Sequence, residues 1–267
     1  MVRIQHESTP NTTTWPAAAE LAGAVGEREL LRLLGLPRGR ELEGELRTRS
    51  DAARGWYARY GRPFVATRKV EAQDLTATGV VLSDGSELRS ARLAEGLRVA
   101  RGHAVLVAAV SAGREVAAEV ARAWAEGRPD EAYFLDRFAA AVTEELVRQA
   151  SGAECRSASE AGETLLSPHS PGCGDFAIGD QHRLMALLGA RPAGAERVAL
   201  GPVELLPSGA LDPPHSLLAA LGVTRHALPA TTAEALCRGC ELDPCTFRRA
   251  PKPLAARTIE ATGSVRA

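Results

Sequence analysis

The stretch that decides the fold reads LSPHSPGCGDFAIGD at residues 166–180, and a second segment, ELLPSGALDPPHSLLAALG at 204–222, accompanies it. The first stretch places Pro, Gly, Cys and Gly in a row at 171–174 and continues into a run typical of a helix up to Leu188. We therefore predict a tight loop that leads into a helix. The free N–H groups at the start of that helix would point back at the loop.

The two glycines of this loop, Gly172 and Gly174, can adopt positive φ and let a ligand approach the backbone, while flanking prolines stiffen it. A polar or anionic small molecule would suit such a loop. The alternative is an ordinary structural turn capped by Asp175 or Asp180. The residues alone leave both readings open.

Upstream of this stretch, the sequence predicts helices and then a hairpin. Leucines at helical spacing in ELLRLLGL end at Gly35 and Pro37, and residues 42–60 form a second helical pattern. Residues 64–88 change to short β-prone runs, with Asp84 and Gly85 as the turn of an antiparallel pair.

Two further helices should follow a strand at 103–110. The first helix, at 114–126, should bury Val116, Val120 and Trp124. The second, at 130–150, carries a repeating apolar stripe that is typical of core and not of a cofactor site. The members of that stripe are Phe134, Phe138, Val142 and Leu146.

The remaining pattern is a helix at 181–188 closed by Gly189, and a strand at 198–206 that turns at 207–209. Helices, a hairpin and strands do not alternate regularly. The sequence therefore predicts an α+β fold with a mainly antiparallel sheet. We expect a flexible N-terminal arm at 1–20, one domain at 21–250 and a tail at 251–267.

The composition and charge of the chain argue against several classes of function. The 267 residues are 45% hydrophobic with a formal net charge of −1. Scattered basic residues favour neither nucleic acid nor a membrane surface as partner. The N-terminus does not have the profile of a secretory signal, and we expect a cytoplasmic protein whose five cysteines are thiols or metal ligands rather than disulfides.

P-loop, H-E-x-x-H and G-x-S-x-G motifs do not occur, and the neighbours His215 and Ser216 are not expected to face each other as base and nucleophile.

The loop resembles the signature of the activation domain of cobalamin-dependent methionine synthase and of short free-standing proteins like it. That signature reads Arg, two variable residues, Pro-Gly-Tyr, and then Gly-Asp in the short members. Segments 27–35 and 103–150 also look like the family. The matching signature residues are Pro171, Gly172, Gly174 and Asp175, and in the second segment Pro213, Ser216 and Gly222.

The resemblance implies one curved, twisted, mainly antiparallel sheet flanked by helices, and an S-adenosylmethionine site. Pro168 stands at the family's Arg and Cys173 at its Tyr, with His169 adjacent as a partial substitute. Glu144 falls where the family carries a Glu near the ligand; a solvated helix carboxylate is the alternative. The cofactor-binding candidates are Glu144, His169, Pro171, Gly172, Cys173 and Gly174.

The implied function is to bind S-adenosylmethionine beside a cobalamin protein and to support the reductive remethylation of its cobalamin. The sequence has no D-x-H-x-x-G motif, so a corrinoid-binding protein or methionine synthase core would bring the cobalamin. A flavodoxin-type or other protein would donate electrons. Whether the chain itself counts as an enzyme is left open.

Cys237, Cys240 and Cys245 in ALCRGCELDPC can place three sulfurs around one ion. Cys173, Cys155 or His226 could complete a zinc site or an iron–sulfur cluster. The alternative function is therefore a metal- or iron–sulfur-binding accessory protein on the same fold that has lost S-adenosylmethionine binding. Simple buried or reactive thiols are the other possibility.

Overall fold

The structure is a computed structural model that describes residues 12–37, 39–194 and 196–226. Seven α-helices and one short 3-10 helix are found in this part of the chain. They are α1 (Ala18–Ala24), α2 (Glu27–Leu33), α3 (Gly44–Tyr60), α4 (Ala91–Ala100), α5 (Arg114–Ala125), α6 (Pro129–Glu160), η1 (Ile178–Asp180) and α7 (Gln181–Leu187).

The strands fall into a large sheet and a small one. The large sheet contains β1 (Thr12–Thr14), β2 (Phe64–Leu75), β3 (Val80–Leu82), β4 (Glu87–Leu88), β5 (Gly102–Ser111), β6 (Thr164–His169) and β11 (Ser216–Thr224). The small sheet contains β7 (Arg191–Pro192), β8 (Val198–Leu200), β9 (Val203–Leu205) and β10 (Leu211–Asp212).

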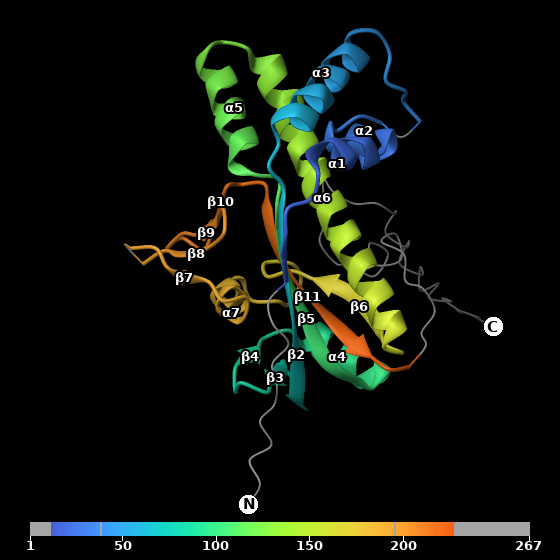
Figure 1. Cartoon of the computed structure of the whole chain (residues 1–267), viewed down its shortest axis with the longest axis vertical. Coiled ribbons are helices and arrows are strands. Elements are labelled where there is room, and N and C mark those ends of the chain that lie inside the picture. The colour runs from blue at the N-terminus through green and yellow to red at the C-terminus, as the bar shows by residue number, and fades with distance from the viewer. Residues whose placement is uncertain (1–11, 38, 195, 227–267) are drawn as a thin grey trace, which may run out of the picture.

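The large sheet has the strand order β4-β3-β2-β5-β11-β6, with β1 paired to β2. The strand pairings of the described residues are antiparallel. Figure 1 shows the sheet as a narrow, twisted ribbon with helices on either side. The predicted α+β fold with a mainly antiparallel sheet is confirmed.

Strand β5 lies at the centre because both of its faces are apolar. Val105, Val107 and Ala109 pack in one cluster with α4 and α7, whereas Ala104 and Leu106 face the opposite side of the sheet. Successive side chains of a strand point to opposite faces, so a continuous apolar run suits a strand covered on both sides.

Helix α6 extends along the molecule and connects its two ends (Figure 1). Its N-terminal half packs with α1, α2, α3 and α5 through the predicted stripe, in which Phe138, Val142 and Leu146 are fully buried. The helix continues ten residues beyond the predicted end at Ala150. Its C-terminal half lies next to β5 and β6, and Glu154 accepts a hydrogen bond from Thr67 of β2, which places it over the sheet.

Several local predictions are confirmed. Asp84 accepts a hydrogen bond from the Ser86 backbone N–H at 2.9 Å, and Gly85 has φ 84°, as a tight hairpin turn requires. Gly189 has φ 81° just after α7. The predicted helices at 114–126 and 181–188 also form, with ends within about one residue of those predicted.

Two predictions are wrong. Trp124 is 55% exposed, because α5 buries Val116 and Ala123 and so turns Trp124 toward solvent. The single strand at 198–206 is two strands, β8 and β9, because Gly201 adopts φ 58° between them.

At the N-terminus, residues 12–20 of the predicted flexible arm contain β1, which pairs with β2, and the start of α1. Thr12, Thr13 and Thr14 lie opposite Thr67, Ala66 and Val65, so backbone hydrogen bonds hold this segment. The boundaries at 21, 250 and 251 stay predictions.

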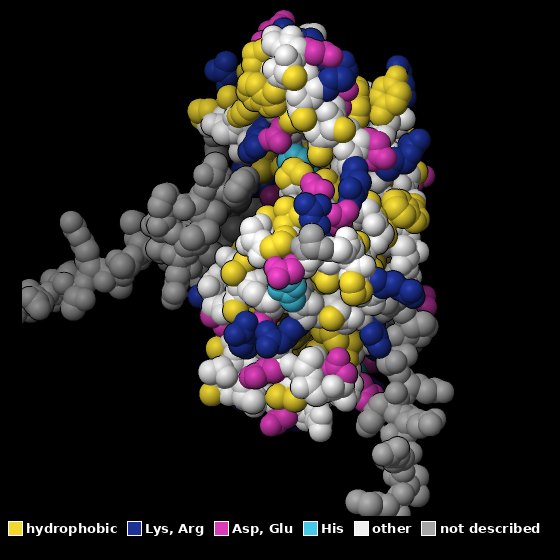
Figure 2. Space-filling model, turned by 90° about the vertical axis from the view of Figure 1, so that its left-hand side faces the viewer, with side chains coloured by type: hydrophobic (Ala, Val, Ile, Leu, Met, Phe, Trp, Pro, Cys, Tyr) yellow, Lys and Arg dark blue, Asp and Glu magenta, His cyan; other side chains and the backbone are white. Residues whose placement is uncertain are grey.

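The face in Figure 2 shows Lys and Arg side chains mixed with Asp and Glu, and neither sign covers a continuous surface. Among the described helices, none has both the length and the apolar character that a membrane crossing would require.

Candidate functional site

The loop at 171–174 follows β6 and turns as predicted. Gly172 has φ 85° and Gly174 has φ 63°, so both need the freedom of glycine. The Gly172 N–H donates to the Phe176 carbonyl at 2.8 Å, and the Cys173 N–H donates to that of Ser170 at 3.0 Å. These bonds close a tight loop that leaves Cys173 exposed.

The loop does not lead directly into a helix. The buried Phe176 and the short η1 separate it from α7, which begins only at Gln181. The expectation that helix N–H groups point at the loop is therefore wrong. The chain needs this extra turn because Phe176 packs into the cluster beneath α4 and α7.

Asp175 connects the loop to α4. Its carboxylate accepts a hydrogen bond from the Arg92 backbone N–H at 2.9 Å and lies 3.4 Å from the Ser90 hydroxyl. Ser90 in turn accepts from the Leu93 N–H at 3.2 Å and caps the helix. Asp175 therefore satisfies a free N–H group of α4, a helix more than 70 residues away in the sequence, and not of its own helix.

Asp180 makes the second connection, and its side chain is fully buried. It accepts from the Arg89 backbone N–H at 2.6 Å and from the Arg89 guanidinium at 2.7 and 2.9 Å. The Arg183 guanidinium also contacts it. Hydrogen bonds to a charged acceptor are stronger than neutral ones, so Asp180 fixes residues 175–180 against the start of α4.

Arg92, which sequence reasoning missed, places a guanidinium beside the loop. A Cβ atom on Gly174 would lie 3.5 Å from Arg92 Nη1, and Arg92 Nε is 4.0 Å from Asp175 Oδ1. The Arg92 side chain is 40% exposed. Its place in the sequence, after a Ser in a helix start, gives no sign that it would meet residue 174.

His169 is the last residue of β6 and is half-buried. Burial lowers the pKa of its imidazole, Arg92 acts in the same direction, and Asp175 opposes them. The net lowering favours the neutral ring near neutral pH. Arg92, Asp175 and His169 thus form one polar group around the glycine loop.

Pro168 lies in β6 opposite Leu221 of β11, and Pro171 is buried. Both prolines are therefore part of the framework that holds the loop. The side chain of Pro168 has no hydrogen-bond donor and no charge. A cation that could bind an anionic ligand at the loop therefore has to come from another element.

Glu144 lies on α6 rather than on the loop. Its carboxylate pairs with Arg32 of α2 at 2.5 Å, and Arg32 also pairs with Glu29 at 2.7 Å. The Glu144 side chain is 26% exposed. Glu144 is therefore not the solvated carboxylate of the alternative interpretation. It forms an ion pair that connects α2 and α6.

The metal-site predictions remain untested. Cys237, Cys240 and Cys245 lie outside the described residues. Within the described part, Cys155 on α6 and Cys173 are exposed cysteines, and no group of three or more His, Cys, Asp or Glu residues could hold a metal ion. His226 donates its backbone N–H to Thr224 at 3.1 Å.

His215 and Ser216 have different partners, as expected. His215 Nε2 lies 2.9 Å from Asp136 Oδ1, whereas the Ser216 hydroxyl donates to Ser111 at 2.9 Å. Burial works to raise the pKa of Asp136, but hydrogen bonds from His215 and Arg137 outweigh it and lower that pKa. These contacts connect α6 to the start of β11 and give Ser216 no base.

Comparison with solved structures shows the fold to be that of a known domain. The crystal structure of the MetH reactivation domain bound to AdoHcy matches with a TM-score of 0.60 and 11% identity, over 84% of this chain and 82% of that chain. No protein-family model and no curated protein matches the sequence. At this identity the likeness establishes an activation-domain-like fold.

Proposed function

We propose that the loop at 171–174 binds S-adenosylmethionine and that the protein supports the reductive remethylation of a cobalamin-dependent methyltransferase of the methionine synthase type. The observation that carries the proposal is the fixed glycine loop on a fold shared with a reactivation domain solved with AdoHcy. Asp175 and Asp180 hold that loop in place. A preorganised loop loses less entropy when a ligand binds.

The residues present fit the charges of such a ligand. S-adenosylmethionine has a carboxylate, an ammonium group and a sulfonium. The Arg92 guanidinium beside Gly174 would hold the carboxylate, a role that Pro168 cannot take. Asp175, 32% exposed, offers a carboxylate nearby for a positive group. Because the Gly172 and Cys173 N–H groups already donate within the loop, these residues would contribute backbone carbonyls, and His169 a neutral ring.

The chain's own part in the reaction is positioning. Bound S-adenosylmethionine supplies the methyl group, and a partner protein brings the cobalamin that receives it. The loop, Arg92 and Asp175 orient the ligand and limit the access of water to it. Glu144, whose carboxylate pairs with Arg32, stays a candidate for holding a polar group of the ligand. A corrinoid-binding protein or methionine synthase core, and an electron donor of flavodoxin type, are the partners that this role requires.

Isothermal titration of the anaerobically purified protein with S-adenosylmethionine tests the proposal. Saturable binding is expected, and Arg92→Gln should weaken it about tenfold, since a charged hydrogen bond is lost. Arg98→Gln is the matched control, because Arg98 lies on the same helix but pairs with Glu95. Titration with decarboxylated S-adenosylmethionine should be insensitive to Arg92→Gln. No binding of S-adenosylmethionine at millimolar concentration would refute the proposed function.

A second candidate function is a metal- or iron–sulfur-binding accessory protein on the same fold. Two residues favour this candidate. Pro168 stands in the β6–β11 pairing where the family's ligand-binding Arg is expected, and it has no side-chain donor for S-adenosylmethionine. Cys173 exposes a thiol in the loop, and a thiolate is a metal ligand. Cys237, Cys240 and Cys245 would then hold zinc or an iron–sulfur cluster, with Cys173 as the fourth ligand. Metal analysis of anaerobically purified protein, wild type and Cys240→Ser, would distinguish the two: bound zinc or iron that the variant loses, without S-adenosylmethionine binding, supports this candidate.

A further inference from the structure

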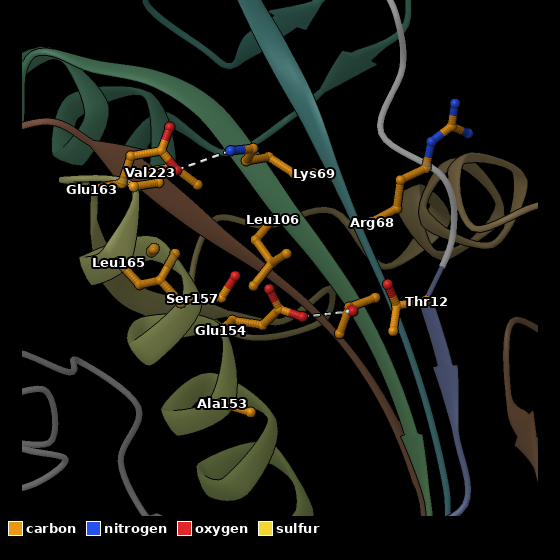
Figure 3. Close-up of a pocket in the computed structure, with 13 residues that line it drawn as sticks. Thr12, Arg68, Lys69, Leu106, Ala153, Glu154, Ser157, Glu163, Leu165 and Val223 are labelled. Carbon is orange, nitrogen blue, oxygen red and sulfur yellow. Dashed lines mark hydrogen bonds and ion pairs between the residues drawn. The ribbon is translucent and has the colours of Figure 1, made fainter.

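A cavity of about 340 Å³ lies between the C-terminal half of α6 and the large sheet (Figure 3). It exists because the residues of α6 change in size along the helix. The N-terminal half fills the space to its neighbours with Phe138, Val142 and Leu146. Farther along, Ala153, Ser157 and Ala158 line the cavity, and their short side chains leave the space open.

The floor of the cavity is apolar. Leu106 of β5 and Val223 of β11 are almost completely buried, and Leu165 of β6 packs beside them. These side chains point from the sheet toward α6. A short aliphatic chain would be favoured there, because its own apolar surface would leave water.

One end of the cavity carries a fixed charge cluster. Glu163 is 7% exposed, and its carboxylate contacts Lys69 Nζ at 2.9 Å and His103 Nε2 at 3.0 Å. Burial works to raise the pKa of Glu163, but the bonds from Lys69 and His103 outweigh it and lower that pKa. Glu163 is therefore ionised near neutral pH and balances the charge of Lys69. The Lys69 ammonium has three N–H groups, so it can also donate to a ligand.

Glu154 lies toward the other end of the same cavity (Figure 3). Its Oε1 atom accepts a hydrogen bond from the Thr67 hydroxyl at 2.8 Å. A carboxylate can accept several hydrogen bonds, so this one leaves capacity for a ligand donor. Ser157 and Thr12 add hydroxyl groups to the lining.

The charges that line the cavity favour a positive group near Glu154. Lys69 and Glu163 cancel, and Glu154 leaves one negative charge. Arg68 lines the cavity too, but its side chain points away in Figure 3 and donates to the Leu187 carbonyl at 2.6 Å. The group that Glu154 can best accept from is thus an ammonium.

We propose that this cavity binds a small ω-amino acid-like molecule, with its ammonium at Glu154, its aliphatic chain on Leu106 and Val223, and its carboxylate at Lys69. Thr67 and Lys69 are two positions apart on β2, which separates their Cα atoms by roughly 7 Å. A chain of four methylene groups between ammonium and carboxylate covers a similar distance. The cavity shares no lining residue with the loop at 171–174, so this site is separate from the S-adenosylmethionine site proposed above.

Isothermal titration with 5-aminopentanoate tests the proposal, with pentylamine and pentanoate as probes that carry only one of the two charges. Saturable binding of 5-aminopentanoate at millimolar concentration is expected, with pentylamine weaker and pentanoate weaker still. Glu154→Gln should weaken 5-aminopentanoate at least about tenfold, because it removes the charge but keeps an acceptor for Thr67. Circular dichroism would confirm that the variant is folded.

Glu160→Gln is the matched control, since Glu160 lies on the same helix but not in the cavity. Ser157→Leu fills the cavity without touching a charge and should abolish binding. The proposal is overturned if 5-aminopentanoate fails to bind the wild-type protein, or if both Glu154→Gln and Ser157→Leu leave its affinity unchanged. Equal binding of pentanoate and pentylamine would also overturn it, because Glu154 would then not select for charge.

Discussion

Asp180→Asn should destabilise the protein substantially, although it changes only one atom. The Asp180 carboxylate is fully buried and receives four hydrogen-bonding contacts, from the Arg89 backbone N–H, two guanidinium nitrogens of Arg89, and Arg183. An asparagine keeps one acceptor oxygen and turns an N–H₂ group toward donors. The loop and the start of α4 would lose their common anchor.

The size of the expected stability loss depends on how exposed the hydrogen-bond partners of Asp180 are. Arg89 is 50% and Arg183 39% exposed, so both guanidinium groups would regain much of their hydration in the variant. The loss of stability would then come mainly from two sources. One is the weakened hydrogen bond from the Arg89 backbone N–H, and the other is the Asn N–H₂ group, which would face other donors. Bonds to charged groups contribute about 1.5–3 kcal/mol, which gives an expected loss of about 2–3 kcal/mol in the free energy of unfolding.

Equilibrium unfolding in urea, followed by circular dichroism, measures this loss. Glu95→Gln is the control, because Glu95 on α4 is 60% exposed and pairs with Arg98, which lies on the same helix. It should leave stability almost unchanged. A loss below about 0.5 kcal/mol for Asp180→Asn would refute the idea that Asp180 anchors the loop.

Two further predictions concern Tyr57 and His169. Tyr57 is fully buried and donates to the Ala112 carbonyl at 2.7 Å, so Tyr57→Phe should cost about 1–2 kcal/mol in urea unfolding, with the exposed Tyr60→Phe as control. The lowered pKa of His169 means that the unfolded chain binds a proton first as pH falls, so stability should decrease below about pH 6.5. His169→Gln should reduce the loss between about pH 7 and about pH 5.5, and an unchanged loss would contradict this assignment.

Local patterns predicted most of the helices and the hairpin correctly. The apolar stripe at Phe138, Val142 and Leu146 repeats at helical spacing and is buried as expected. Trp124 fitted its stripe equally well but lies in solvent, because α5 buries Val116 and Ala123 instead. Periodicity gives the apolar side of a helix, but the partner surface decides which residues on that side are covered.

The candidate site was predicted in part. The positive φ angles of Gly172 and Gly174 follow from residue type, and the loop forms where the sequence placed it. Arg92 was missed, because its guanidinium meets residue 174 only through the packing of α4 against the loop. Likewise, no pattern around Glu144 indicated its ion pair with Arg32, which is 112 residues away.

The sequence by itself therefore determined α2, α3, α5, α6 and α7, the hairpin, the glycine loop and the apolar run of β5, whereas α1, α4, β6 and β11 were not predicted. The predicted features depend on backbone preferences and on periodicity, which act over a few residues. The tertiary structure alone decided that Asp175 and Asp180 meet the start of α4, and that small residues of α6 leave a cavity over Leu106 and Val223. The hydrogen bonds of Asp175 and Asp180 join residues 83 and 91 positions apart, and α6 is likewise distant in sequence from Leu106 and Val223. The energies of such contacts depend on burial and distance, which no local pattern encodes.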